Sequence, residues 1–271
     1  LYTDVGLLTS SPAFGMDASS LFNALTGYSD PPRMKKLVMA PSQLRDRLLK
    51  LVDRETRRAQ DGQPGLIRAK MNALVDERMT EALYRASAAG VRVLLNVRGI
   101  CVLRPGVKGL SENIEVVSIV GRFLEHARIF HFHNGGEDEV YLASADWMPR
   151  NLDRRVELMA PVEAADCRRR LLHTLDVLFQ DNVKGRRLGA DGAWRVPVRH
   201  ASDGSFFRRG SATLGQRRGD EARSESTIRP RRRRPGGRCT SWPRASPATI
   251  ARSSAGPRRP GPSCSSRRAK G

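Results

Sequence analysis

The sequence lacks several features that define common classes of protein. Its 271 residues include only four cysteines, and these form no CxxC pair and no cluster with histidine. The cysteine pattern therefore predicts no structural zinc site and indicates a reducing environment. No apolar run reaches the length of about 18 residues that a transmembrane helix requires. The GxxxxGK[ST] loop, the GxSxG elbow and the HExxH motif are also absent, so P-loop nucleotide binding, hydrolase-type serine catalysis and zincin-type metal binding are unsupported.

Positive charge is plentiful but unevenly distributed. The net charge is +20, and residues 191–271 hold 20 Lys and Arg against 5 Asp and Glu, whereas residues 1–190 hold 28 against 23. The segment 191–271 is rich in Arg, Pro, Ser and Gly, and it buries too little apolar surface to offset its ordering entropy. We therefore expect a disordered basic tail. Two origins remain open, a genuine tail or out-of-frame translation of a GC-rich gene, and the abrupt change of composition near Val196 favours the second.

Between the N-terminal residues and the tail, short apolar runs alternate with amphipathic segments. We expect a short helix from Asp17, a longer helix capped by Ser42 and ended by Asp61 and Gly62, and further helices over 76–89 and 163–179. Strands are expected over 36–41, 65–74, 91–97, 115–120, 127–133, 139–145 and 154–161. The alternation predicts an α/β domain with a sheet flanked by helices, and the Asn134-Gly135-Gly136 turn adds an antiparallel hairpin.

Candidate functional residues gather around that hairpin. Side chains two residues apart on a strand point to the same face, so His126 and Arg128 are expected to lie together. The hairpin returns the chain so that Ser144 and Asp146 reach the end of the neighbouring strand. An imidazole can accept a phosphoryl group or donate a proton, and a guanidinium can neutralise phosphate. The pattern predicts a phosphate site at this end of the hairpin.

Other polar residues have weaker signals. Asn151 is expected to hold a phosphate oxygen or to fix the tautomer of the histidine. Arg150, with its neighbours at 154 and 155, forms either an anion clamp or a solvated rim. Arg98 ends an apolar strand and enters a loop, which is where α/β sheets bind ligands; a solvated arginine is the alternative. We expect His131 and His133 to be polar residues of the hairpin rather than metal ligands.

Several longer runs carry a family resemblance. LYTDVGLLT, LNVRGICVLRPGVKGLSENI, SIVGRFLEHARIF and SADWMPRNLDRRVE resemble the C-terminal half of the polyphosphate kinases whose catalytic domains adopt the phospholipase D-like fold. The resemblance extends from Leu1 to about Arg187. It implies reversible transfer of the terminal phosphate of ATP to polyphosphate through a phosphohistidine, with Mg²⁺. It also implies that two phospholipase D-like halves each contribute a histidine to one site.

The resemblance assigns roles to individual residues. Tyr2 matches a tyrosine that contacts the nucleotide, Arg98 matches an arginine that binds ATP, and His126 matches the histidine of the second half, which also contacts ATP. Arg128 takes the place of the lysine in the superfamily's HxK motif. Ser144-Ala145-Asp146 resembles its Gly-Ser-Ala-Asn corner.

The resemblance also predicts how the chain is divided. Residues 1–34 would be the end of an incomplete first catalytic domain, 35–190 the second catalytic domain, and 191–271 the tail. The phosphate-accepting histidine and the residues associated with Mg²⁺ would lie upstream, so we expect this chain to be a fragment that is inactive alone. The full-length protein is expected to be a cytoplasmic homo-oligomer, or peripheral at the inner face of the membrane.

Two other functions stay open. A phospholipase D-like phosphodiesterase would share the fold and His126 but would transfer to water. A basic polyanion- or RNA-binding module would use the tail, although beyond Phe207 that segment offers only Trp242 as a stacking aromatic. Any nucleic-acid binding through the tail is therefore expected to be nonspecific.

Overall fold

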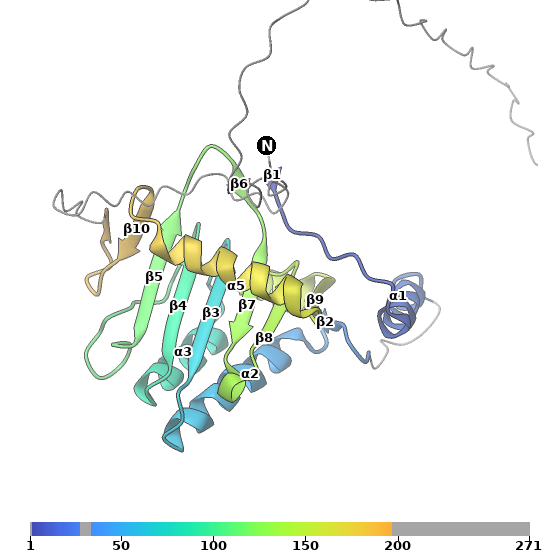
Figure 1. Ribbon diagram of the computed structural model, residues 1–271, viewed down its shortest axis with the longest axis horizontal. Coiled ribbons are helices and arrows are strands. Elements are labelled where there is room, and N and C mark those ends of the chain that lie inside the picture. Colours follow the sequence, from blue (N-terminus) through green and yellow to red (C-terminus); the bar gives the residue numbers. More distant parts are fainter. Residues whose placement is uncertain (1, 28–33, 197–271) are drawn as a thin grey trace, which may run out of the picture. The chain divides into compact units, whose positions relative to one another are not determined.

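A nine-stranded mixed sheet dominates the computed structural model, which describes residues 2–27 and 34–196. The strand order is β11-β10-β5-β4-β3-β7-β8-β9-β2, with β3, β4 and β5 parallel and the remaining neighbours antiparallel (Figure 1). The strands of this sheet are β2 Val38–Ala40, β3 Leu66–Met71, β4 Arg92–Val97, β5 Ile114–Ile119, β7 Arg128–Phe132, β8 Glu139–Ala143, β9 Glu157–Pro161, β10 Gly185–Leu188 and β11 Trp194–Arg195. A separate parallel pair joins β1 (Tyr2–Thr3) to β6 (Leu124–Glu125).

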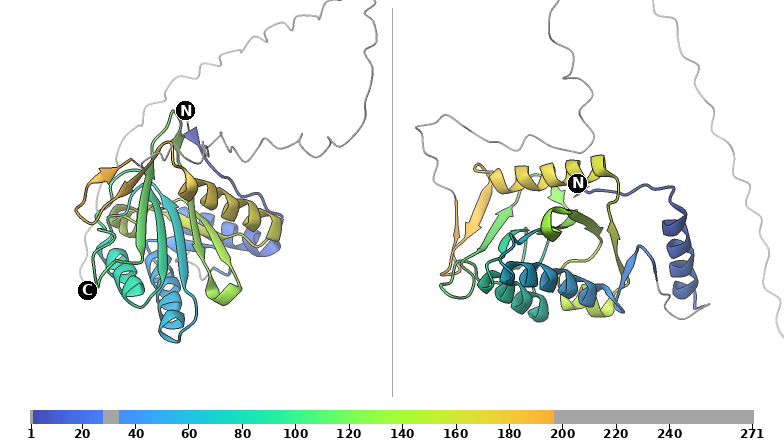
Figure 2. Two further views of the ribbon diagram at one scale, coloured as in Figure 1. Left: turned by 60° about the vertical axis from the view of Figure 1, so that its left-hand side comes forward. Right: turned by 60° about the horizontal axis from the view of Figure 1, so that its bottom comes forward.

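Helices cover both faces of the sheet. Helix α5 (Ala165–Gln180) crosses one face, and α2 (Leu44–Gln60) and α3 (Glu77–Ala88) cover the other, as the tilted view in Figure 2 shows. The remaining helices are α1 (Pro12–Leu25), the short α4 (Pro149–Arg154) and the 3₁₀ turn η1 (Asn134–Gly136). The expected class, a mixed sheet flanked by helices, is confirmed. Within the described residues, no helix is both long and apolar enough to cross a membrane.

The sheet strands separate apolar from polar side chains by simple alternation. On β3, Ile67, Ala69 and Met71 are fully buried in the main core against α2 and α3. Arg68 turns to the opposite face, where its Nη1 pairs with Asp176 of α5 at 2.5 Å. The alternation therefore places charged groups on the α5 face of a central strand, where each of them needs a polar partner.

Two helix starts differ from the expectation. Helix α1 begins at Pro12, and Asp17 lies inside it rather than capping it. The carboxylate of Asp17 instead accepts the backbone N–H groups of three successive residues, 35 to 37, at 2.6 to 2.9 Å. Burial would raise the pKa of Asp17, but these donors outweigh it and hold the pKa below its usual value. Ser42 was also wrong as a cap, because α2 starts at Leu44 with Gln43 at the cap position.

The predicted end of α2 and start of α3 agree with the structure, whereas a strand lies within the predicted disordered tail. Asp61 and Gly62 end α2, and Asp76 caps α3 by accepting the N–H of Met79 at 3.0 Å. The β10–β11 hairpin was not expected, and β11 falls in the stretch after residue 190 that was assigned to a disordered tail. The predicted disorder is therefore not found at Trp194 and Arg195. The rest of the tail, from residue 197, lies outside the described residues, and the domain boundary at 34 stays a prediction.

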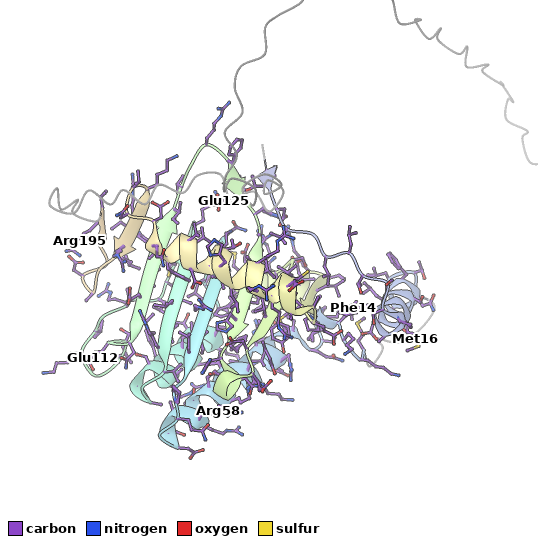
Figure 3. All side chains as sticks on the ribbon, in the orientation of Figure 1. Phe14, Met16, Arg58, Glu112, Glu125 and Arg195 are labelled. Carbon is purple, nitrogen blue, oxygen red and sulfur yellow. The ribbon has the colours of Figure 1, made fainter. Side chains whose placement is uncertain are left out.

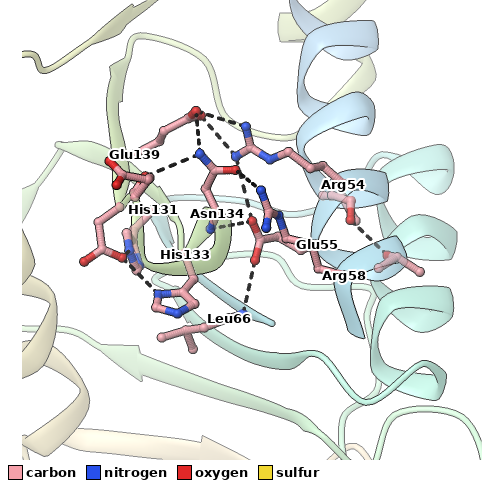
Figure 4. Close-up of polar contacts among 12 residues, drawn as sticks. Arg54, Glu55, Arg58, Leu66, His131, His133, Asn134 and Glu139 are labelled. Carbon is pink, nitrogen blue, oxygen red and sulfur yellow. Dashed lines mark hydrogen bonds and ion pairs between the residues drawn. The ribbon is translucent and has the colours of Figure 1, made fainter. Parts of the chain in front are cut away.

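Helix α2 anchors the turn between β7 and β8 (Figure 4). The side chain of Glu55 is fully buried, and its Oε1 accepts the N–H of Asn134 at 2.8 Å. Arg58 donates to Oδ1 of Asn134 at 3.0 Å, and Arg54 forms two bonds to Glu139. These contacts fix the hairpin from the helix side, at the end of β7 opposite to His126.

His131 is held in a buried polar cluster at the same end. Its side chain is 1% exposed, its Nε2 lies 2.7 Å from Asp138 Oδ1, and Nε of Arg68 donates to its Nδ1 at 3.0 Å. His133 shares the Asp138 carboxylate at 3.2 Å. Burial lowers the pKa of His131 to about 4, even though Asp138 acts in the opposite direction. The expectation that His131 and His133 are structural is consistent with these contacts.

The His131 cluster predicts a pH dependence of stability. The pKa of His131 falls from 6.5 to about 4 on folding, so between these values the unfolded chain binds a proton that the folded chain does not. Stability should therefore drop as the pH falls from 6.5 to 4, by about 3 kcal/mol from this group. The lowered pKa of Asp138 adds a further loss below pH 3.8. Urea unfolding of the chain at a series of pH values measures the slope.

A matched pair of variants isolates the contribution of His131. His131→Gln removes the titrating ring, so the slope between pH 6.5 and 4 should flatten. His173→Gln alters an exposed histidine on α5 and should keep the slope of the unsubstituted chain. Equal slopes in the two variants would show that His131 does not carry the effect.

Candidate active site

The topology brings the ends of four strands to one edge of the sheet. Strands β3 and β4 run parallel and finish at Met71 and Val97. Strand β7 runs antiparallel to β3, so its first residue, Arg128, lies at this edge, opposite the last residue of β8. Residues just after β3, β4 and β8 and just before β7 therefore meet. This edge holds most of the polar residues that the sequence singles out.

A buried ion pair forms the centre of the cluster. Arg128 donates from Nε to Asp146 Oδ1 at 3.1 Å and from Nη2 to Oδ2 at 2.9 Å, and both side chains are about 10% exposed or less. Asp146 Oδ1 also accepts the backbone N–H of Asn72 at 2.7 Å. Asp146 thus orients the guanidinium of Arg128. A direct contact between Asp146 and phosphate stays a prediction.

His126 lies beside this pair but not on the same strand. It follows β6 and precedes β7, and its backbone N–H donates to the carbonyl of Thr3 at 2.8 Å. Nη1 of Arg128 is 3.0 Å from both ring nitrogens, so the expected meeting of His126 and Arg128 is found. The two residues do not belong to one continuous strand, because β6 ends at Glu125 and pairs with β1, and β7 starts at Arg128.

The β1 segment supplies two further neighbours of the histidine. Asp4 Oδ2 lies 2.9 Å from Nδ1 of His126, and the ring of Tyr2 packs edge-on against the imidazole at a centroid distance of 5.5 Å. A carboxylate only accepts hydrogen bonds, so the contact with Asp4 favours a proton on Nδ1. Asp4, rather than Asn151, is the residue whose side chain contacts the ring of His126.

A second polar group lies at the end of β8. Glu157 accepts hydrogen bonds from the hydroxyl of Ser144 and from Nδ2 of Asn151, the latter at 2.6 Å. Asn151 is buried and Ser144 is exposed, and neither contacts His126 directly. Arg150 is exposed and does not line the adjoining pocket, whereas Arg155 does. The phosphate roles of Ser144, Asn151 and Arg150 stay predictions.

The His126 and Glu157 groups line a common pocket of about 840 Å³. Its polar wall includes Asp4, His126, Arg128, Ser144, Asn151, Arg155 and Glu157. The apolar wall includes Leu37 and Phe14, and Figure 3 shows Phe14 on the sheet side of α1, with Met16 on its other side. The pocket thus combines two arginines, one imidazole and two carboxylates with an apolar surface.

Arg98 belongs to the same edge but does not line this pocket. It follows β4, is half-buried, and donates from Nε to Asn72 Oδ1 at 3.1 Å. Its carbonyl accepts from the hydroxyl of Ser118 at 3.1 Å. The structure therefore connects Arg98 to the Arg128 pair through Asn72, a residue that the sequence analysis did not single out.

The carboxylates of the site, which are its potential metal ligands, already have side-chain partners. Asp4 faces His126, Asp146 pairs with Arg128, and Glu157 accepts from Ser144 and Asn151. Among the described residues, no group of three or more His, Cys, Asp or Glu side chains is placed to hold a metal ion. The predicted involvement of Mg²⁺ with residues outside this segment stays a prediction.

Comparison with known proteins decides the family. The family model for the polyphosphate kinase C-terminal domain 2 matches residues 37–205, which is more than half of the chain. The chain belongs to the polyphosphate kinase family. The polyphosphate kinase of Rhodopirellula baltica is 54% identical over 195 residues, which are 72% of this chain and 23% of that protein. The Synechocystis polyphosphate kinase is 52% identical over 194 residues, 72% of this chain and 27% of the relative.

A solved structure agrees with the sequence relatives. The crystal structure of the polyphosphate kinase from Porphyromonas gingivalis superposes with a TM-score of 0.70 at 38% identity, over 74% of this chain and 30% of the other. The chain spans about a quarter of the length of the curated polyphosphate kinases it matches. The family resemblance stated from the sequence is confirmed, and the activity of the longer proteins is taken up below as a proposal.

The sequence analysis did not single out several polar residues that lie at this edge of the sheet. Asp4 and Glu157 sit inside the LYTD and DRRVE runs, so the runs could have drawn attention to them. Lys70 and Asn72 have a fainter signal, because they are polar residues at the end of an otherwise apolar strand. Such residues are rarely buried without a specific partner.

Gly99 offers a direct test of how tightly this edge is packed. A Cβ at Gly99 would lie 2.9 Å from the carbonyl oxygen of Asn72, and the backbone cannot yield as a flexible side chain would. Gly99→Ala should therefore push the ends of β3 and β4 apart and lower the free energy of unfolding by about 1 to 3 kcal/mol. Urea denaturation of the chain measures the loss.

Gly6→Ala provides the control, because no atom lies within 4 Å of a Cβ built there. Its free energy of unfolding should stay within about 0.5 kcal/mol of the unsubstituted chain. Equal stability of the two variants would contradict the close approach of Gly99 and Asn72.

Proposed function

We propose that this chain forms the second phospholipase D-like catalytic domain of a polyphosphate kinase. In this proposal, the complete protein transfers the terminal phosphate of ATP to a growing polyphosphate chain, reversibly, through a phosphohistidine. The observation that carries the proposal is the placement of His126 in the wall of a pocket, in contact with Asp4 and Arg128, in a chain of this family.

The geometry suits a partner role for His126 in phosphoryl transfer. A histidine supplied by the upstream half would attack the terminal phosphorus, and the bond from that phosphorus to the leaving oxygen of ADP would break. As the imidazolium, His126 would keep its Nδ1–H on Asp4 and present Nε2–H, which would donate a proton to that oxygen or stabilise its charge. The terminal oxygen of polyphosphate would then attack the phosphohistidine and release the upstream imidazole.

Charge neutralisation falls to the arginines. Phosphoryl transfer spreads negative charge over the equatorial oxygens, so fixed cations beside them lower the barrier. Arg128 is fixed in orientation by the two hydrogen bonds that it donates to Asp146, and Arg98 by the one that it donates to Asn72. In the proposed complex, Arg98 and Tyr2 contact the nucleotide. Mg²⁺, when bound, would add charge neutralisation, with ligands that we place outside this segment.

A chimeric enzyme tests the proposal. The part of this chain that aligns with the Rhodopirellula baltica polyphosphate kinase replaces the corresponding segment of that enzyme. The chimera should form acid-insoluble polyphosphate from ATP labelled on the terminal phosphate, whereas the 271-residue chain alone should form none. A version of the relative that lacks the segment serves as the negative control.

Each outcome separates the candidate functions. A folded chimera without polyphosphate synthesis would contradict the proposal. Release of p-nitrophenol from bis(p-nitrophenyl) phosphate by the chain alone would favour the phosphodiesterase alternative. Circular dichroism and thermal unfolding of the chimera establish that it is folded before either conclusion is drawn.

A further inference from the structure

Strand β3 tethers the backbone on both sides of His126. Nζ of Lys70 donates to the carbonyl oxygens of Glu125 and Ala127, at 3.0 and 2.8 Å. Two residues further along, Nδ2 of Asn72 lies 3.5 Å from the carbonyl oxygen of His126. Three successive carbonyls around the histidine are thus contacted by two side chains from the end of β3. Figure 3 shows the labelled Glu125 at this end of the sheet.

Asn72 also contacts the other parts of the site. Its Oδ1 accepts from Nε of Arg98 at 3.1 Å, its backbone N–H donates to Asp146 at 2.7 Å, and its carbonyl accepts the N–H of Gly99 at 2.7 Å. Asn72 is only 8% exposed. It is therefore held on both backbone groups while its amide reaches Arg98 on one side and His126 on the other.

We infer that Asn72 is a positioning residue for phosphoryl transfer, which sets the guanidinium of Arg98 relative to His126. The inference rests on the proposed function. An arginine side chain has many rotamers, and an acceptor at Nε restricts them. In the proposed complex, the two terminal nitrogens would face the nucleotide phosphates. The side-chain amide of Asn72 combines an acceptor for Arg98 with a donor toward the His126 carbonyl.

A double-mutant cycle in the active chimera tests the inference. Asn72→Ala should lower kcat/KM for ATP about 10- to 100-fold, because a hydrogen bond to a charged group is lost. Arg98→Ala should cause a similar or larger loss. If Asn72 acts through Arg98, the double variant should fall within about twofold of Arg98→Ala alone. Fully additive losses would overturn the inference.

A second variant covers the case in which Asn72→Ala does not fold. Asn72→Asp has the same shape and keeps an oxygen for Nε of Arg98, but it loses the donor that faces the His126 carbonyl. Because it keeps the oxygen that orients Arg98 and loses only the long 3.5 Å contact to the His126 carbonyl, it should keep both KM for ATP and kcat within about threefold of the unsubstituted chimera. A loss of kcat/KM of about tenfold or more in a folded Asn72→Asp chimera would overturn the inference.

Asn113→Ala is the matched control. Asn113 is also an asparagine beside a parallel strand, and its Nδ2 donates to the carbonyl of Ser87 at 2.9 Å, away from the pocket. Its removal should leave kcat/KM within about twofold. The unsubstituted chimera separates the two claims: if it is folded and inactive, the proposed function fails, and if it is active with additive losses, only the role of Asn72 fails.

Discussion

His126→Ala is expected to lower polyphosphate synthesis by the chimera about 100- to 10,000-fold, the range for loss of a positioned acid or base. His126 is the one histidine among the described residues that line the pocket, and Asp4 and Arg128 hold its ring from two sides. No other described residue of the pocket wall offers an imidazole in its place. Initial rates from labelled ATP measure the effect.

The matched control for this substitution is His173→Ala. His173 is exposed on α5, away from the pocket, and its removal should leave the rate within about twofold. Near-normal synthesis by His126→Ala, in a folded chimera, would show that the histidine of this half is dispensable and would sink the proposed mechanism.

Asp146→Ala is expected to lower the free energy of unfolding by about 3 to 5 kcal/mol, because it leaves the buried guanidinium of Arg128 without its partner. It also removes the acceptor for the backbone N–H of Asn72. Activity should fall with stability, since Arg128 loses both bonds that orient it toward His126. Urea denaturation of the chain and rates from the chimera measure the two losses separately.

A compensating double variant distinguishes the two losses. Arg128→Met with Asp146→Leu replaces the buried pair by apolar side chains and should recover part of the stability, because no unpaired charge remains although the N–H of Asn72 still lacks its acceptor. Activity should stay low, because the cation beside His126 is gone. Recovery of activity together with stability would mean that Arg128 acts only as a structural residue.

The local sequence pattern was sufficient to predict secondary structure where neighbouring residues alone determine it. The apolar runs over 65–74, 91–97, 127–133 and 139–145 predict β3, β4, β7 and β8, and the Asn134-Gly135-Gly136 turn predicts their hairpin. In that turn, Asn134 and Gly135 adopt φ values of 50° and 68°, a conformation that asparagine and glycine tolerate better than other residues. Such preferences are short-range, so they can be read from neighbouring residues.

Alternation also predicts correctly that His126 and Arg128 meet, but for an incomplete reason. The chain does not run as one strand through both residues, because β6 pairs in parallel with β1 more than 100 residues earlier in the sequence. That pairing brings Asp4 to Nδ1 of His126. A contact between segments so far apart has no signature in the spacing of either segment.

The start of α2 and the strand β11 were also predicted incorrectly. Ser42 has the right chemistry for a helix cap, but α2 begins two residues later, after the turn that follows β2. Trp194 and Arg195 look like part of a basic tail, yet β10 offers them an edge to pair with. In both cases a tertiary neighbour outweighs the local preference.

The sequence by itself determined the family, the class of fold and the identity of most residues at the functional edge, because motifs and alternation are encoded in adjacent positions. Only the tertiary structure decided what each polar group does there. It assigned Asp146 to Arg128, Asp4 to His126, and Asn72 to both Arg98 and the His126 backbone. Buried polar groups must find partners when water is removed, and those partners come from whichever strands the topology places side by side.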